Sequence, residues 1–177
     1  MIRLFAAIAI PYELGEDLSG RQSGLDGARW RPVEAFHITL RFAGDLPEPT
    51  ADDFDSALSA VRGKPFELQL ESTGAFGDGR DIHAVWAGVA ESEPLNILQG
   101  RCESAARKAG LKPETRKYRP HVTLAYLSHP DPAAVADWLQ RHSWLKSPPF
   151  KVDRFGLYSS HQTHEGSRYR LEREYLL

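Results

Sequence analysis

Cysteine and long apolar runs are scarce in this 177-residue chain. The single cysteine, Cys102, excludes an internal disulfide, leaves no second thiol for a zinc site and fits a reducing compartment. No segment reaches the ~18 consecutive apolar residues that a membrane-spanning helix needs. The apolar segment 4–10 is followed by Pro11 and Tyr12 in place of a small-residue cleavage site. We therefore expect it to be the first strand of a cytoplasmic protein with no membrane partner.

An excess of positive charge is also missing. The net charge of −2 argues against an extended surface that binds nucleic acid regardless of sequence, since such surfaces are usually basic. It does not exclude recognition of a single RNA end. Basic residues are dense only between Arg107 and Arg119, where they form either a solvated surface or a phosphate contact.

The hydropathy pattern predicts an α+β fold. The order strand, helix, strand, helix occurs before residue 62 and again from about 82 to 141. This repetition predicts a duplicated unit whose two antiparallel sheets meet along a shared seam, in one two-lobed domain over residues 1–177. The expected helices span 11–24, 49–61, 95–109 and 132–141, and the expected strands span 2–10, 36–43, 66–71, 82–89, 121–127, 150–159 and 167–176.

The same tetrad occurs in two of these strands, as His-Ile-Thr-Leu at 37–40 and as His-Val-Thr-Leu at 121–124. One strand histidine is usually structural, but chance does not readily produce two such tetrads. Side chains alternate along a strand, so each histidine shares a face with its threonine about 6–7 Å away. Two such faces across a groove place two imidazoles beside a small anion held by two hydroxyls.

This constellation suits the cleavage of a phosphodiester. One neutral imidazole can take a proton from water while the other, protonated, gives a proton to the leaving alkoxide. The threonine hydroxyls can hold the phosphoryl oxygens. Both tetrads lack carboxylates, so we expect neither a metal nor another cofactor. The spacing alone does not tell which histidine is the acid.

Nearby residues give weaker signals. Arg41 continues the His37 face under strict alternation and either clamps a phosphate or decorates the surface. Tyr126 falls on the apolar face of its strand, as a packing residue. Trp86 either stacks on a base or belongs to the core.

These motifs resemble a known family. The segments 36–44 and 119–125 are similar to the two signatures of bacterial RNA 2′,3′-cyclic phosphodiesterases, also called 2′-5′ RNA ligases, which are two-histidine phosphoesterases. The resemblance extends to Arg-Leu-Phe at 3–5, Val-Trp-Ala-Gly-Val at 85–89 and Leu-Tyr-Ser-Ser at 157–160. It implies a bilobal fold with pseudo-twofold symmetry, flanking helices and an active site in the central groove.

The resemblance also implies roles for the site residues. His37 would be the proton donor, His121 the proton acceptor, and Thr39 and Thr123 the phosphate ligands, in a hydrolysis that yields a 2′-phosphomonoester. The family commonly has an arginine, a candidate phosphate ligand, where this chain has Tyr126. Either the phosphate affinity is lower or another arginine supplies the charge; the candidates are Arg41, Arg116 and Arg119.

Other functions stay open at this stage. The same site can join RNA ends as a 2′-5′ ligase, although abundant water favours hydrolysis unless both ends are held together. A non-catalytic module that binds RNA ends is a second alternative, and the presence of both histidines argues against it. A phosphodiesterase for cyclic nucleotides or ADP-ribose cyclic phosphate is a third. We expect a monomer that acts on RNA ends or on oligonucleotides with a cyclic phosphate.

Overall fold

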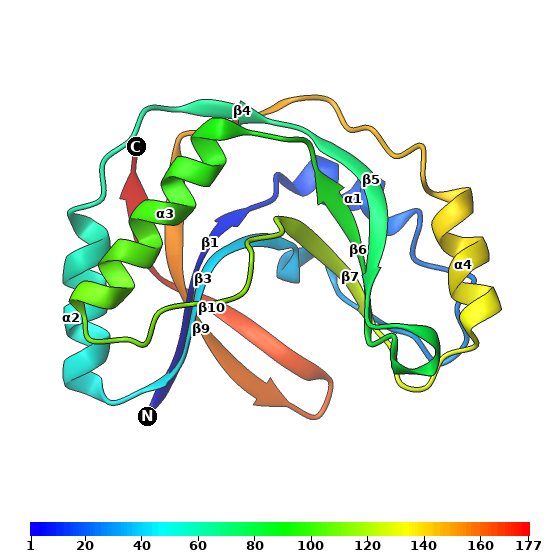
Figure 1. Ribbon diagram of the computed structural model, residues 1–177, viewed down its shortest axis with the longest axis horizontal. Coiled ribbons are helices and arrows are strands. Elements are labelled where there is room, and N and C mark those ends of the chain that lie inside the picture. Colours follow the sequence, from blue (N-terminus) through cyan, green and yellow to red (C-terminus); the bar gives the residue numbers. More distant parts are fainter.

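The computed structural model describes residues 1–177 and has the form of an arch with two lobes (Figure 1). Each lobe contains a four-stranded antiparallel sheet, which confirms the expected α+β fold with two such sheets. The first sheet has the order β10-β9-β1-β3, from β1 (Ile2–Ala9), β3 (His37–Leu46), β9 (Arg154–Thr163) and β10 (Gly166–Leu176). The second has the order β2-β7-β6-β5, from β2 (Arg29–Trp30), β5 (Leu70–Phe76), β6 (Ala84–Val89) and β7 (His121–Tyr126).

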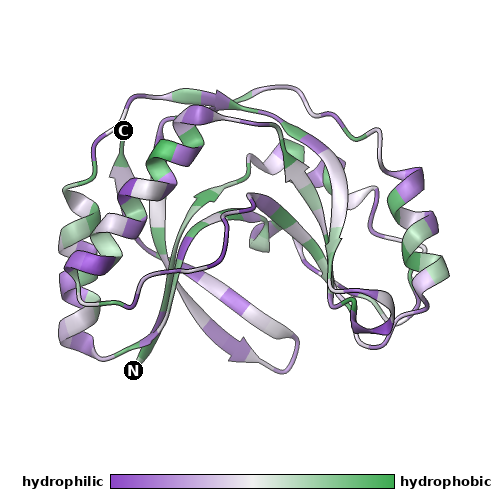
Figure 2. Ribbon diagram, in the orientation of Figure 1, coloured by the Kyte–Doolittle hydropathy of each residue, from purple (hydrophilic) through white to green (hydrophobic).

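Four helices cover the outer sides of the arch. In Figure 1, α2 (Glu48–Ser59) and α3 (Glu93–Lys108) lie outside the first sheet, and α4 (Pro132–Arg141) lies outside the second. The shorter α1 (Tyr12–Ser19) is linked to α4, because the Trp138 indole N–H donates to the carbonyl of Arg21 over 3.1 Å. Figure 2 shows apolar and polar residues alternating along these helices, as expected for helices with one buried side. None of the helices is long and apolar enough to cross a membrane.

The two halves of the chain repeat one order of elements, β1-α1-β3-α2 and then β6-α3-β7-α4. In the second repeat, α3 packs against β3 of the first lobe before the chain returns to the second lobe as β7. The motif strands β3 and β7 approach each other where the sheets meet. One cluster of 35 buried residues extends through both lobes, with Cys102 of α3 among them.

Both motif strands contain a β-bulge at the same place. Ala6 pairs with Arg41 and Ala7 with Thr39, which leaves Leu40 unpaired. Likewise Val85 pairs with Ala125 and Trp86 with Thr123, which leaves Leu124 unpaired. An unpaired residue shifts the alternation of side chains by one position.

The bulges correct two expectations. Arg41 was expected on the face of His37 and Tyr126 on the apolar face of β7. Instead Arg41 is turned into the protein interior, where it is 8% exposed. The aromatic residues five positions after each histidine, Phe42 and Tyr126, line a cavity that the two histidines also line.

Further differences from the expected elements concern short strands and the first helix. The predicted strand 150–159 is divided into β8 (Phe150–Val152) and β9, and β8 pairs with β4 (Phe66–Leu68) as a separate two-stranded sheet. The two-residue β2 was not predicted, because two residues carry no periodicity. Helix α1 ends at Ser19, five residues earlier than predicted, since the following polar and glycine residues offer nothing to bury.

Candidate active site

The two motif histidines are held in the same way. His37 Nδ1 lies 2.8 Å from the carbonyl oxygen of Ala35, and His121 Nδ1 lies 2.6 Å from that of Arg119. A carbonyl only accepts hydrogen bonds, so Nδ1 carries the proton in both rings. Each imidazole therefore keeps Nε2 for the cavity, as a proton acceptor when neutral and as a donor when protonated.

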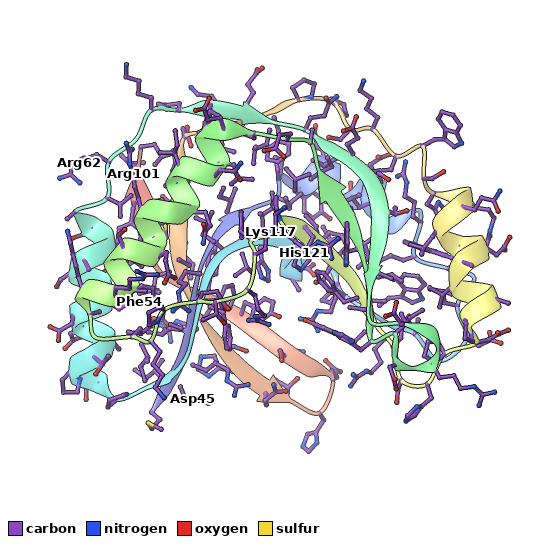
Figure 3. The ribbon with its side chains drawn as sticks, in the orientation of Figure 1. Asp45, Phe54, Arg62, Arg101, Lys117 and His121 are labelled. Atoms are coloured by element: carbon purple, nitrogen blue, oxygen red, sulfur yellow. The ribbon has the colours of Figure 1, made fainter.

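Both imidazoles line one cavity of about 260 Å³ in the groove between the lobes. The structure brings together four of the predicted site residues here, His37, Thr39, His121 and Thr123. Figure 3 shows His121 on the inner side of its lobe, directed toward the groove. The other lining residues are Arg3, Phe5, Arg31, Ala35, Phe42, Tyr126, Ser160, Ser167 and Tyr169.

His37 is the more enclosed of the pair. Its ring centroid lies 4.8 Å from that of Phe5 and 5.1 Å from that of Tyr169. Burial is the main cause that lowers its pKa from 6.5 to about 4; the Ala35 carbonyl opposes this shift, and the charges of His121 and Arg31 add to it. Thr39 Oγ1 lies 3.0 Å from His37 Nε2, so the hydroxyl can donate to the neutral ring.

His121 stands between different aromatic rings. The Phe76 ring meets it edge to face at 4.8 Å, and the Trp86 ring lies 5.8 Å away. Burial lowers the pKa of His121, the Arg119 carbonyl raises it and the Arg119 charge lowers it further. Trp86 itself packs flat on Gly74, where an added Cβ would meet the ring at 2.2 Å. Because Trp86 pairs with Thr123, it lies on the same sheet face as His121 and packs beside that ring, although it does not line the cavity.

The arginines predicted as phosphate ligands lie elsewhere. Arg41 forms a buried ion pair with Glu103 of α3 and donates to the carbonyl of Lys112 over 2.6 Å. Arg119 has an exposed side chain, and its backbone carbonyl orients His121. Arg116 is exposed and paired with Glu114 at 2.9 Å. None of these three side chains lines the cavity.

Two cavity arginines were missed by reasoning from the sequence. Arg3 reaches the cavity from β1 but is paired with Asp45 at 2.9 Å. Arg31, directly after β2, lines the cavity and donates to the carbonyl of Ser167 over 2.8 Å. No motif or periodic pattern in the sequence points to Arg31, because its strand has only two residues.

The loop that leads into β7 is fastened to the first lobe. The Tyr118 hydroxyl donates to the carbonyl of Thr39 over 2.9 Å. Glu103 accepts from the amide of Glu114 over 3.0 Å, and Arg41 binds the carbonyl of Lys112. These three hydrogen bonds join the loop that precedes the second motif to the side of the groove that carries the first motif.

The donors that line the cavity are two imidazoles, hydroxyls and guanidinium groups. The structure contains no group of three or more histidine, cysteine, aspartate or glutamate side chains placed to hold a metal ion. The arrangement can take up one proton and release another on opposite sides of a bound anion, which is the requirement of general acid–base catalysis.

Comparison with known proteins identifies the family. The pattern of the 2′-5′ RNA ligase superfamily matches residues 16–164. The RNA 2′,3′-cyclic phosphodiesterase of Archaeoglobus fulgidus is 28% identical over 172 residues, which are 96% of this chain and 97% of that protein. The protein of the same name from Methanothermobacter thermautotrophicus is 31% identical over 135 residues, 73% of each chain.

Solved structures share the fold. E. coli LigT complexed with 3′-AMP superimposes with a TM-score of 0.79 at 24% identity, over 99% of this chain and 98% of that one. TT0787 of Thermus thermophilus gives a TM-score of 0.81 at 23% identity, with the same coverage. The sequence match and the shared arch agree, and the chain belongs to the 2′-5′ RNA ligase superfamily.

Proposed function

We propose that this protein is a hydrolase that opens the 2′,3′-cyclic phosphate at the end of an RNA and leaves a 2′-phosphomonoester. The observation that carries this function is the pair of histidines with Nδ1 bound to a backbone carbonyl, both of which offer Nε2 to one cavity beside Thr39 and Thr123. The relatives named RNA 2′,3′-cyclic phosphodiesterases support the same substrate class.

In the proposed reaction, neutral His121 accepts a proton from a water molecule as the water oxygen attacks phosphorus. The bond between phosphorus and the 3′ oxygen breaks, and protonated His37 donates its Nε2 proton to that oxygen. The hydroxyls of Thr39 and Thr123 hold the non-bridging oxygens. Water is consumed, and each histidine ends in the protonation state in which the other began.

The protonation states follow from the bound anion. The pKa of His37 in the folded protein is about 4, so its ring is neutral near pH 7. The negative charge of a bound cyclic phosphate raises the pKa of a nearby imidazole, because it favours the charged form. Substrate binding thus favours protonation of His37, which later donates this proton.

The test is an oligoribonucleotide that ends in a 2′,3′-cyclic phosphate, incubated with the protein in EDTA. We expect a terminal 2′-phosphate, identified by phosphorus NMR. EDTA should not prevent its formation, because the proposed reaction needs no metal. Loss of activity in EDTA that a divalent ion restores would contradict the metal-free mechanism. His164→Ala, at an exposed position on the β9–β10 hairpin, is the matched control and should keep full activity.

The same assay separates the alternatives. A 2′-5′-linked product from two RNA ends would identify a ligase, and binding without turnover would identify an RNA-end-binding module. We further propose that the protein works as a monomer in the cytoplasm; its one thiol, Cys102, is buried and needs no partner. Gel filtration with light scattering checks the monomer.

A further inference from the structure

Arg31 is placed on the cavity wall by its backbone. Its amide donates to the carbonyl of Leu124, the bulged residue of β7, over 2.8 Å. Its side chain is only 7% exposed, so it runs along the cavity and does not extend into solvent. The end of β2 therefore delivers a cation beside the second motif strand.

Two tyrosine rings contact this cation. The guanidinium carbon lies 5.7 Å from the centre of the Tyr126 ring and 5.4 Å from that of Tyr169. These distances suit a cation–π interaction with each of the two rings. A single hydrogen bond of good geometry, to the Ser167 carbonyl, fixes one edge of the guanidinium. A guanidinium has five N–H donors, so most of its donor capacity is free for a ligand.

The charge of Arg31 is not neutralised by the protein. No carboxylate lies within 4.0 Å of it, whereas the other cavity arginine, Arg3, is paired with Asp45. Glu165, which shares a neighbouring recess with Arg31, is paired with Arg168 instead. A nearly buried charge without a counter-ion is costly, and such charges mark sites where an anionic ligand binds.

The charge also reaches the histidine pair. After burial and the charge of His121, the charge of Arg31 is a further cause of the low pKa of His37. A phosphate held between the two imidazoles lies within range of the same field. The geometry of the wall and the electrostatics of the histidines therefore point to one anion position.

We propose that Arg31 is the phosphate-binding cation of this site, supplied from the end of β2, while Tyr126 of β7 provides one of the rings that hold it in place. The inference rests on the proposed function and names a further substrate-binding residue for it. The ligand group is the phosphate of an RNA end, a cyclic diester before the reaction and a monoester after it. Arginine suits this task because its planar fork can bind two phosphate oxygens at once.

Arg31→Gln tests the charge while keeping an N–H donor for the Ser167 carbonyl. Removing a charge-assisted hydrogen bond to the phosphate should lower kcat/KM for the cyclic-phosphate oligonucleotide roughly 10–100-fold. The loss should appear mainly in KM, because the phosphate is bound before and during the reaction. Arg29→Gln removes an exposed arginine from the same strand, outside the cavity, and should leave kcat/KM unchanged.

A second variant returns the charge from the other strand. Tyr126→Arg introduced into Arg31→Gln should regain most of the lost kcat/KM, because the bulge directs position 126 into the cavity. Circular dichroism melting confirms that each variant is folded. A folded double variant that regains neither KM nor phosphate affinity would show that Arg31 acts only through packing, and would overturn the proposal.

Titration with inorganic phosphate, followed by calorimetry, separates this inference from the proposed function. If the wild-type protein opens no cyclic phosphate, the proposed function fails, but weaker phosphate binding by Arg31→Gln still supports the cation. If the wild-type protein is active and folded Arg31→Gln matches it in both KM and phosphate affinity, the inference fails alone. Should Arg31→Gln unfold, Arg31→Lys replaces it: a several-fold higher KM supports the inference, and an unchanged KM contradicts it.

Discussion

The strands β3 and β7 share a backbone design but give their histidines different surroundings. Both have a bulge one residue after the threonine, and both hold the histidine Nδ1 with the carbonyl two residues earlier. His37 is packed between Phe5 and Tyr169, and its Nε2 contacts Thr39. His121 lies against Phe76 and Trp86, with no side-chain partner at Nε2. Backbone geometry thus aims the two rings alike, and the neighbouring side chains set how readily each takes a proton.

Replacing either histidine should have the largest effect. His37→Ala and His121→Ala should each lower kcat roughly 10²–10⁴-fold, the usual size of a general acid–base contribution. The double variant should lose less than the product of both, because the two groups act as one unit. A folded single variant with full activity would refute the mechanism.

A nitrophenyl ester substrate then divides the two roles. Its leaving group needs no proton, so it should restore turnover of the variant that lacks the acid and not of the variant that lacks the base. We expect restored turnover for His37→Ala. Restoration for His121→Ala alone would reverse the assignment of donor and acceptor.

The position after each bulge also differs, with Arg41 on β3 and Ala125 on β7. Arg41→Ala should lower the free energy of unfolding by roughly 3 kcal/mol, because it leaves the largely buried Glu103 without its closest partner. Urea denaturation measures this loss. Arg119→Ala, at an exposed position, should change stability by no more than about 0.5 kcal/mol. Equal losses for both would contradict the structural role of Arg41.

The two threonines sharpen the comparison on a smaller scale. Thr39→Val and Thr123→Val each keep the side-chain shape and remove a hydroxyl that we propose binds phosphate, at an expected cost in kcat/KM on the order of 1–3 kcal/mol. Thr39→Val should cost more, because its hydroxyl also contacts Nε2 of His37. Steady-state kinetics on both variants decides this order, and a larger loss for Thr123→Val would show that the contact is unimportant in turnover.

A further effect concerns pH and stability. His37 has a pKa of about 4 in the folded protein and an ordinary value of 6.5, so between these values the unfolded chain binds a proton that the folded one does not. Its contribution to stability is complete above pH 6.5 and is lost as the pH falls toward 4, at up to about 1.4 kcal/mol per pH unit. His37→Gln should reduce the dependence of the urea midpoint on pH between pH 6.5 and pH 4. An unchanged slope would mean that His37 is not desolvated.

The same pKa values shape the rate profile. Both histidines have lowered pKa values in the folded protein, so kcat/KM should depend on pH as a bell-shaped function with its maximum below pH 6.5. Bound phosphate raises both pKa values, so the maximum of kcat should lie at higher pH than that of kcat/KM.

Sequence reasoning located the histidine–threonine pairs and failed at the residues just beyond them. Strict alternation along the strand correctly places His37 and Thr39 on one face. It assumes that every residue is paired, so the unpaired Leu40 makes it place Arg41 on the wrong face. The bulge forms because the partner strand and the core fix the register. These are contacts between distant segments that a local pattern does not record.

The roles of Arg31 and of the partner of Arg41 could not be predicted from the sequence, for a related reason. Arg31 follows a two-residue strand, too short to give a periodic signal, and its value depends on two tyrosines from β7 and β10. The choice of Glu103 as the partner of Arg41 depends on α3 crossing to the first lobe. The repeated tetrads could be found because each is complete within four residues.

The Tyr118 hydroxyl, bound to the Thr39 carbonyl, has a consequence for how the enzyme opens. Together with the bonds at Lys112 and Glu114, it ties the approach to His121 to the opposite lobe, so a hinge at this seam would have to break three hydrogen bonds. We therefore expect the two lobes to keep their relative position during the reaction. We therefore also expect product to leave without a lid movement that limits turnover.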